Sequence, residues 1–167
     1  RLKQLELNYD QSINLSTALD DLCTQAIEAV KSGYRLLVLS DRAIEKGKLP
    51  IHSLLATGAI HHALIKAGVR TDANLIIETG YARDAHQFAC LLGFGATAVY
   101  PYLALNVISD MIEQGEMLGD PVEASSNYRK ALDKGLLKIL SKMGISTVTS
   151  YRGAQLFEAV GLSDEVV

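Results

Sequence analysis

Short strand-like runs alternate with longer helical ones along the chain, and this alternation predicts an α/β fold whose mostly parallel sheet is covered by helices. The run 36–39 is apolar at every position, as in a strand buried on both faces. Gly33 and Gly68 each come directly after a run of residues with helical spacing, and glycine is common at the end of a helix. The β/α units are fewer than the eight of a closed barrel. We therefore expect one domain over residues 1–167, with an open sheet that is incomplete and TIM-barrel-like.

The first two elements are indicated by their hydrophobic period. Leu5, Leu7 and Tyr9 alternate with polar residues, which predicts a strand with one wetter face, at an edge of the sheet. Apolar residues with helical spacing follow over 15–30, and Asn14 stands where its side chain can cap the helix. The chain thus opens with a β/α unit.

The next helix is predicted to start at Pro50, because the first helical turn does not need the missing N–H of proline. Its expected buried stripe is Ile51, Leu55, Gly58, His62 and Ile65. The remaining expected strands are 73–77, 96–99 and 146–149, and the remaining helices are 84–92, 101–115, 125–143 and 153–160, with a loop over 116–122.

Composition excludes several classes of protein. Of the 167 residues, 49% are hydrophobic and 21% are charged, which is too apolar for a disordered chain. The net charge of −3 offers no basic field for nucleic acid, and no apolar run reaches the length of a membrane span. Two cysteines fit a reducing, cytoplasmic setting. Because the chain begins with Arg1 and closes without a polar tail, we expect it to be a segment of a longer protein.

Two local patterns suggest cofactors but fit structural roles better. Gly93, Gly95 and Ala98 match part of a dinucleotide fingerprint, yet they follow a predicted helix and enter a strand, the reverse of that motif. Gly95 is therefore interpreted as a turn residue. His61 and His62 point about 100° apart on a helix and do not easily share a metal ion. We expect His62 to be a hydrogen-bonded core residue, with His61 beside the apolar stripe.

Polar residues gather where the predicted strands end, the edge at which β/α folds bind ligands. They are Ser40, Asp41, Arg42, Glu78, Thr79, Tyr100, Thr149 and Ser150. This edge is the candidate for a small-molecule or anion site. No nucleophile and base pair is recognisable there, and Asp41 beside Arg42 also fits a structural ion pair.

The helix expected over 125–143 carries a basic face with a single acid, Asp133. Its cations are Arg129, Lys130, Lys134, Lys138 and Lys142, and its apolar side holds Tyr128, Ala131, Leu132, Leu136, Ile139 and Met143. One reading is a solvated face above a core face. The other is docking against an acidic surface, because lysines four residues apart repel each other.

From "LLVLSDR" at 36–42 onward, the chain resembles the central domain of the large chain of glutamate synthase, in its bacterial form. The resemblance is carried by "LPIHSLLATGAIHHALIKAGVRTDANLIIETG" (49–80), "HQFACLLGFGATAVYPYLAL" (86–105) and "KGLLKILSKMGISTVTSYRGAQLFEAVGL" (134–162). It implies part of a flavin and iron–sulfur enzyme that forms glutamate from 2-oxoglutarate and glutamine.

The resemblance also implies a division of roles. The family's central domain connects a glutaminase domain to an FMN domain of the same large chain, helps to frame the path of ammonia between them, and works with a small electron-donating subunit. The glutaminase nucleophile is a cysteine at the mature N-terminus, and the iron–sulfur cluster takes three cysteines of a later domain. Cys23 and Cys90 match neither pattern. We therefore assign no catalytic, FMN, iron–sulfur or metal residue to this chain, and expect it to be inactive alone.

Two surfaces are candidates for contact with the neighbouring domains, the basic helix and the segment after it. Their residues are Arg129, Lys134, Lys138, Lys142, Ser150, Tyr151, Arg152 and Gln155. The alternatives are a self-contained β/α domain that binds a small molecule or anion at the strand ends, and an interaction module that docks through the basic helix.

Overall fold

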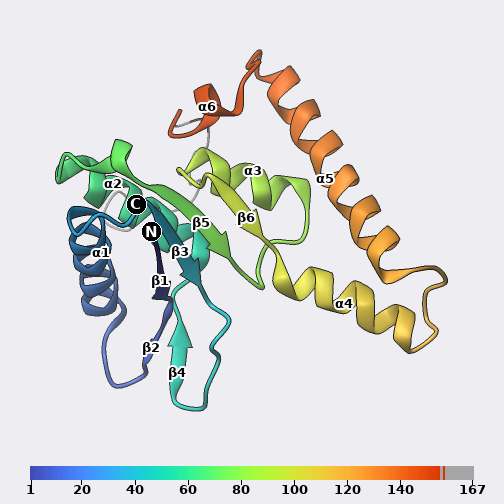
Figure 1. Cartoon of the computed structure of the whole chain (residues 1–167), viewed down its shortest axis with the longest axis horizontal. Coiled ribbons are helices and arrows are strands. Elements are labelled where there is room, and N and C mark those ends of the chain that lie inside the picture. The colour runs from blue at the N-terminus through green and yellow to red at the C-terminus, as the bar shows by residue number, and fades with distance from the viewer. Residues whose placement is uncertain (155, 157–167) are drawn as a thin grey trace, which may run out of the picture.

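The computed structural model describes residues 1–154 and 156, and its centre is a four-stranded sheet (Figure 1). The strands lie in the order β1 (Leu2–Glu6), β3 (Leu36–Ser40), β5 (Asn74–Glu78) and β6 (Ala98–Tyr100). Every neighbouring pair is parallel. The predicted α/β class is confirmed, and β1 lies at an edge of the sheet as expected.

Helices connect successive strands of this sheet, as parallel pairing requires, and further helices follow β6. They are α1 (Leu15–Lys31), α2 (Ser53–Lys66), a 3₁₀ turn η1 (Arg70–Asp72), α3 (Ala85–Gly93), α4 (Tyr102–Glu113), α5 (Pro121–Lys142) and α6 (Val148–Tyr151). None of the helices in the described residues is long and apolar enough to cross a membrane.

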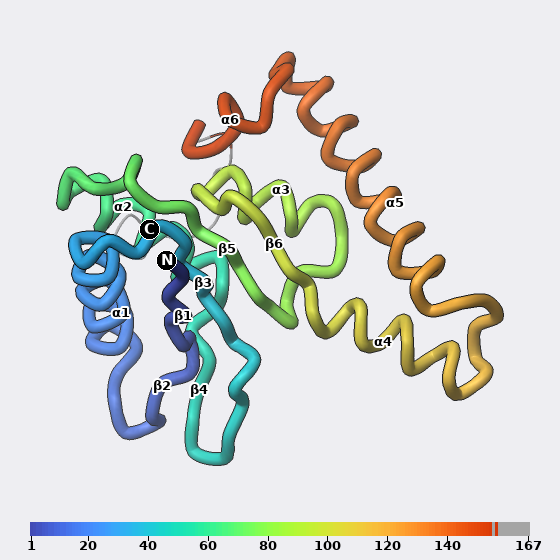
Figure 2. Tube along the Cα trace, viewed as in Figure 1, coloured from blue at the N-terminus to red at the C-terminus, as the bar shows by residue number. Residues whose placement is uncertain are grey.

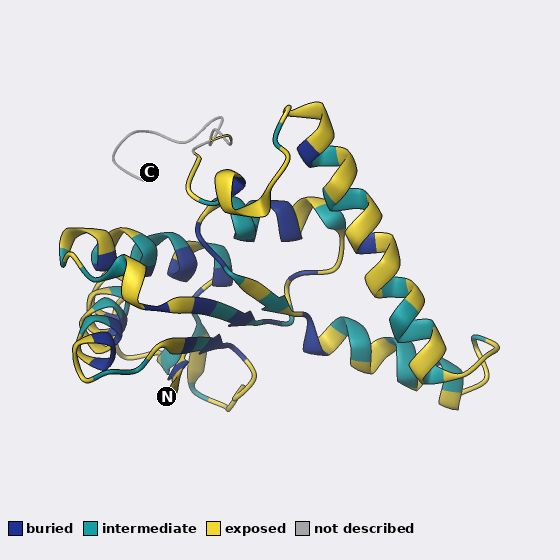
Figure 3. Ribbon diagram, turned by 45° about the horizontal axis from the view of Figure 1, so that its top comes forward, coloured by how far each residue is buried: buried dark blue, intermediate teal, exposed yellow. Residues whose placement is uncertain are grey.

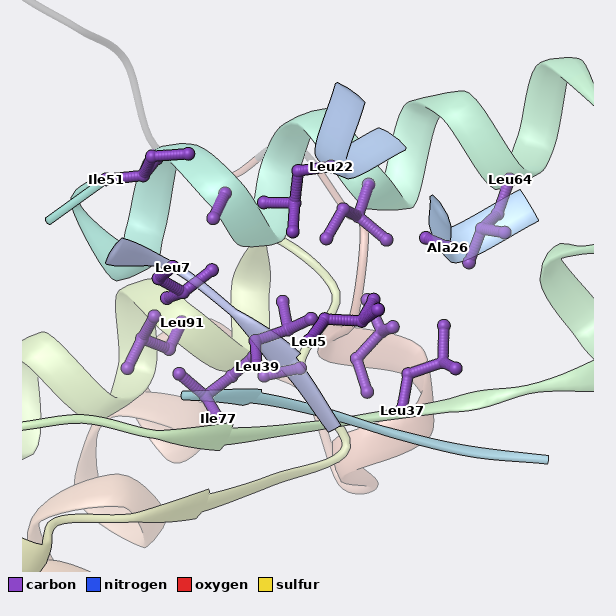
Figure 4. Close-up of a cluster of buried hydrophobic side chains, with 14 of the residues drawn as sticks. Leu5, Leu7, Leu22, Ala26, Leu37, Leu39, Ile51, Leu64, Ile77 and Leu91 are labelled. Atoms are coloured by element: carbon purple, nitrogen blue, oxygen red, sulfur yellow. The ribbon is translucent and has the colours of Figure 1, made fainter. Parts of the chain in front are cut away.

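The main core lies between the sheet and helices α1, α2 and α3 (Figure 4). Leu37, Leu39 and Ile77 are fully buried on the sheet, and Leu22 and Leu64 meet them from α1 and α2. Each such side chain contributes about 1.5–3 kcal/mol through its removal from water. Alternate residues of β3 and β5 face this core. Each of these strands ends in a polar residue, Ser40 in β3 and Glu78 in β5.

Local capping and turn residues define the ends of the helices, and two of them, Asn14 and Gly95, act as the sequence predicts. The side chain of Asn14 accepts a hydrogen bond from the backbone N–H of Thr17 at 2.8 Å and caps α1. Asp84 and Gln87 form a reciprocal capping box at the start of α3. Gly95 has a φ of +116° in the turn between α3 and β6, which confirms its interpretation as a turn residue.

The first expected strand is divided in two, and this changes the next expected helix. Strand β2 (Asn8–Asp10) leaves the sheet and pairs antiparallel with β4 (Lys48–Pro50). The start of a helix at Pro50 is therefore wrong. Proline is tolerated in this short ribbon because an edge strand does not need every N–H. Helix α2 begins after His52, whose Nδ1 accepts from the backbone N–H of Leu54 at 3.2 Å.

The buried face of α2 also differs from the predicted stripe. The buried residues are Ser53, Ala56, Thr57, Ile60 and Leu64, whereas Leu55 and Ile65 are exposed. His62 is exposed too, so its assignment to the core is wrong. The helix carries apolar residues on all its sides, so their spacing alone does not identify the side that packs on the sheet.

The carboxyl-terminal third differs most from the sequence prediction. Helix α5 starts at Pro121, four residues early, because Asp120 accepts from the N–H of Glu123 at 2.9 Å and proline suits the first turn. The strand expected over 146–149 is wrong. Thr147 instead caps the short helix α6, where its capping chemistry outweighs the β propensity of its neighbours. The helix expected over 153–160 lies almost wholly outside the described residues.

Helices α4 and α5 form a hairpin that projects from the β6 side of the sheet (Figure 2). Only Leu132 and Leu140 of α5 are buried, and most of its surface is exposed or half-buried (Figure 3). The hairpin contacts the rest of the fold through α3, which Gly135 approaches so closely that a Cβ there would meet the Cβ of Ala85. A long helical surface thus extends beyond the core.

Candidate functional site

The carboxyl ends of β3 and β5 bring together Ser40, Asp41, Arg42, Glu78 and Thr79, as the sequence predicts. Register explains this, because the last residue of β3 lies opposite the last residue of β5. We call these five residues the strand-end cluster. Their assembly at one edge follows from parallel pairing alone.

Tyr100 joins the strand-end cluster through its backbone, and two other expected members do not. The carbonyl of Tyr100 accepts from the N–H of Thr79 at 3.0 Å. Thr149 and Ser150 lie in α6, which packs on α3 and bonds to the far end of that helix through Gly153. They are separated from the edge because the strand expected there is a helix.

Asp41 is the most buried charged residue of the cluster, with 2% of its surface exposed. It accepts from the Thr79 hydroxyl at 2.5 Å and from the Gly80 N–H at 3.0 Å. Burial, followed by the charge of Asp41, raises the pKa of Tyr102 to about 12. Asp41 thus fixes the chain that follows β5 and faces a tyrosine that keeps its proton.

Glu78 and Arg42 form the outer part of the cluster. Glu78 accepts from the Ser40 hydroxyl at 2.6 Å and from the Arg42 guanidinium at 3.2 Å. The expected pair of Asp41 with Arg42 is therefore wrong, because adjacent residues at the end of a strand point to opposite sides. The Arg42 guanidinium also lies 5.2 Å from the ring centre of Tyr102, in a cation–π arrangement.

Two residues of this edge escape the sequence analysis, Tyr102 and Gly80. Tyr102 stands in the first turn of α4, and its oxygen would lie 3.2 Å from a Cβ at position 80. Gly80 thus permits close packing between this loop and α4. The signal in the sequence is the pair Pro101–Tyr102, because proline at a helix start fixes where the following side chain points.

The two carboxylates of the cluster are bonded within the fold. Both carboxylates already accept hydrogen bonds from neighbours within the fold. A general base must instead present a lone pair to a substrate proton. This arrangement ties β3, β5 and α4 together.

A pocket of about 200 Å³ lies next to this edge, between the start of α2 and α3. His52 and Tyr81 stack there with ring centres 4.8 Å apart, and the Cys90 sulfur lies 3.6 Å from Nε2 of His86. Burial raises the pKa of the Cys90 thiol. The thiol therefore stays protonated near neutral pH and is a poor nucleophile.

The cysteines do not fit the iron–sulfur chemistry of the resemblance. Cys23 lies in α1 and Cys90 in α3, and both are free thiols whose pKa is raised by burial. A cluster needs several thiolates that converge on one point. Within the described residues, no group of three or more metal-binding side chains is brought together.

The two adjacent histidines have different environments. His61 is half-buried, and its Nδ1 accepts from Nε of Arg70 at 2.8 Å. Burial, with the charges of Arg70, His62 and Arg152, lowers the pKa of His61 to about 4. The two imidazole rings meet edge to face, 5.5 Å apart. His61, rather than His62, is the hydrogen-bonded histidine of this pair.

The basic face of α5 is exposed along its length. Arg129, Lys134, Lys138 and Lys142 are all exposed, and none of them forms an ion pair with another described residue. On the opposite side, Leu132 packs in the core, while Ala131 and Met143 are exposed, contrary to expectation. Tyr128 anchors this side by donating to the carbonyl of Arg83 at 2.8 Å.

The segment after α5 has mixed exposure. Ser150 is exposed, Arg152 is half-buried, and Gln155 lies outside the described residues. Tyr151 is only 1% exposed and packs with Ala89 and Leu140. Its side chain thus holds α6 against α3 and α5, whereas Arg152 remains accessible.

Strand order that follows chain order, with intervening helices packed on one sheet face, defines the chain as a β/α-barrel-like domain with an open sheet. A solved flavocytochrome b2 variant shares this fold, with a TM-score of 0.60 and 12% identity over 94% of this chain and 44% of that one. Residues 1–163 match the model of the glutamate synthase central domain. The chain belongs to this family.

Curated relatives agree across bacteria and a fungus. The chain is 45% identical to the glutamate synthase [NADPH] large chain of Bacillus subtilis over 99% of its own length. It is 45% identical to ferredoxin-dependent glutamate synthase 2 of Synechocystis over 92%, and 42% identical to the glutamate synthase [NADH] of Schizosaccharomyces pombe over 91%. It spans 11%, 11% and 7% of these relatives, respectively.

Proposed function

We propose that this chain is a connecting domain of a glutamate synthase large chain, which forms glutamate from 2-oxoglutarate and glutamine. In this role it links the glutaminase and FMN domains and helps to frame the path of ammonia between them. Its family membership supports the proposal, as does its match to a small share of much longer relatives.

The observation that carries this proposal is the closed strand-end cluster. In β/α folds the carboxyl edge of the sheet is the usual place for ligands. Here Asp41 and Glu78 instead bond to Thr79, Ser40 and Arg42. A domain whose ligand edge is filled by its own side chains fits an architectural role.

The cofactors of the whole enzyme are proposed to lie in its other domains. FMN and an iron–sulfur cluster would be held by the domain after this one, and a small subunit would supply electrons. Cys23 and Cys90 do not fit as cluster ligands, since they lie on separate helices. We place the enzyme in the cytoplasm.

The test is a visible absorbance spectrum of the purified chain after incubation with FMN and gel filtration. We expect no flavin absorbance in the protein peak. The control is a colourless protein run on the same column, whose peak defines the baseline absorbance. Retention of FMN in near-stoichiometric amount would overturn the connecting role, because the chain would then hold a cofactor site of its own.

One observation favours a second candidate, a small-molecule or anion site at the same edge. The Arg42 side chain is 53% exposed, so its outer face is open to an anionic ligand. This alternative predicts that 2-oxoglutarate, glutamine or a phosphate ester raises the melting temperature, with a loss of the effect in Arg42→Gln. No shift at millimolar ligand would eliminate it.

A further inference from the structure

A second group of charged side chains lies at the amino end of the sheet, away from the strand-end cluster. It comprises Arg70, Arg152 and His61, which we call the amino-end cluster. Arg70 follows α2, His61 lies within α2, and Arg152 follows α6. Figure 1 shows α6 beside the start of β6, at the end of the sheet opposite α4. Two segments distant in sequence, 61–70 and the residues after α6, thus converge here.

Arg70 is held rigidly by the fold. Its guanidinium donates to Nδ1 of His61 at 2.8 Å, to the carbonyl of Ala73 at 2.7 Å and to the carbonyl of Gly95 at 2.8 Å. A guanidinium has five N–H donors, so two remain beyond these contacts. The rigid position means that little side-chain entropy is lost when a ligand binds.

Arg152 is placed beside this group by the backbone after α6. The N–H of Gly153 donates to the carbonyl of Gly93 at 2.8 Å, and a Cβ on Gly153 would lie 3.3 Å from Nε2 of His61. The Arg152 guanidinium donates once, to the hydroxyl of Thr97 at 3.2 Å. Most of its donors are therefore uncommitted within the described residues.

No carboxylate compensates these two guanidinium groups in the part of the chain that the structure describes. The ion pairs found there join Arg35 with Asp72, Arg42 with Glu78, and Lys48 with Glu45. Burial, followed by the charge of Arg152, lowers the pKa of Arg70. Two half-buried cations that repel each other gain from an anion placed between them.

We propose that the amino-end cluster binds one oxyanion, through the uncommitted donors of Arg70 and Arg152. A planar guanidinium matches the oxygens of a carboxylate, sulfate or phosphate with paired hydrogen bonds. Because Nδ1 of His61 accepts from Arg70, Nε2 carries the proton of the neutral ring, and this nitrogen lies beside the backbone of Gly153, next to Arg152. The ligand is either a free inorganic oxyanion or a carboxylate side chain.

The test compares thermal unfolding of the chain in sodium sulfate and in sodium chloride of equal ionic strength. We expect a saturable stabilisation by sulfate in the original chain, weakened about tenfold or more in apparent affinity by Arg152→Gln. Arg129→Gln is the matched control, because Arg129 is an exposed arginine of α5. It corrects for the general stabilisation that sulfate gives by exclusion from surfaces.

Two further experiments identify the source of the oxyanion and the reason why Arg152→Gln loses the response to sulfate. A chain carrying Glu158→Gln, Asp164→Asn and Glu165→Gln lacks the acids that follow Leu156. If only this chain responds to sulfate, and Arg152→Gln removes the response, a carboxylate of that segment occupies the site. Arg152→Lys should recover part of the response by restoring the charge. The proposal is overturned if sulfate affects the Arg152→Gln and Arg129→Gln chains equally in both backgrounds.

Discussion

The two ends of the central sheet both carry charged side chains, but they satisfy them in opposite ways. At the carboxyl end, Asp41 accepts from Thr79 and Glu78 pairs with Arg42. At the amino end, Arg70 and Arg152 have carbonyl and hydroxyl acceptors but no carboxylate among the described residues. At one end the carboxylates are hydrogen-bonded within the fold, and at the other the two guanidinium groups retain their positive charge.

This difference distinguishes polar groups that stabilise the fold from polar groups that are available to a ligand. A polar network whose members are bonded to one another contributes rigidity to the fold. A pair of uncompensated cations is stabilised only when an external anion joins it. In this domain, we expect the end of the sheet that usually performs chemistry to be structural, and the opposite end to receive a partner.

The largest expected effect is at the closed end, in Asp41→Ala. The substitution leaves the Thr79 hydroxyl and the Gly80 N–H without their acceptor at a site that is 2% exposed. We expect a loss of about 2–4 kcal/mol in the free energy of unfolding, measured by urea denaturation. Asp21→Ala, at an exposed position of α1, should change it by less than about 0.5 kcal/mol. Equal effects of the two would show that the cluster is not structural.

At the open end, Gly95→Ala tests how tightly the amino-end cluster is built. Gly95 has a φ of +116°, and a Cβ there would overlap the His61 ring. We expect a loss of about 2–3 kcal/mol from backbone strain and displacement of His61. Gly115→Ala is the matched control, since it has a φ of +76° with nothing within 4 Å. It should lose only about 1 kcal/mol, and a similar loss for both would mean that His61 is free to move.

A smaller effect is expected from pH. The folded pKa of His61 is about 4, below its ordinary value of 6.5, so the folded state binds fewer protons than the unfolded state between these values. The stability from this group is present above pH 6.5 and is lost as the pH falls towards 4. With a discount for the exposed part of the ring, we expect roughly 1 kcal/mol, or about 2–4 °C in melting temperature.

His61→Gln should flatten this part of the pH profile, and His62→Gln should change it much less, because burial and Arg70 lower the pKa of His61 more than His62 does. The comparison with His62 removes the contribution of carboxylates that titrate in the same range. Saturating sulfate should also reduce the slope, because a bound anion favours the protonated ring. An NMR titration of the His61 ring gives the same answer directly. A profile as steep in His61→Gln as in the original chain would contradict the assignment.

The strand-end cluster could be predicted because it depends on few assumptions. Parallel strands bring their carboxyl ends to one edge, so Ser40, Asp41 and Glu78 converge wherever these strands pair. The choice between catalysis and structure depends on side-chain contacts, such as that of Tyr102 with Arg42, which sequence spacing does not encode. The fold class could also be predicted from few assumptions, because it depends on the alternation of strands and helices along the chain.

The amino-end cluster could not be found in the same way. Arg70 and Arg152 are separated by 82 positions, and they meet only because α6 packs on α3 through Tyr151. The sequence predicts a strand where α6 forms, and that strand would place the segment elsewhere. The face of α2 that carries His61 is also ambiguous, since apolar residues surround this helix. Errors in two elements therefore hide one site.

The smallest effect on stability is expected on α5, where Lys134→Glu and Lys138→Glu reverse two exposed charges. The two substitutions should change the free energy of unfolding by less than about 0.5 kcal/mol, because the lysines have no ion-pair partner among the described residues. Their repulsion at a spacing of four residues also brings no stability. Association with the neighbouring domains, measured by co-purification of separately expressed pieces, should weaken if α5 docks on an acidic surface. Unchanged association would leave the amino-end cluster as the cationic contact of this domain, and α5 as a solvated face.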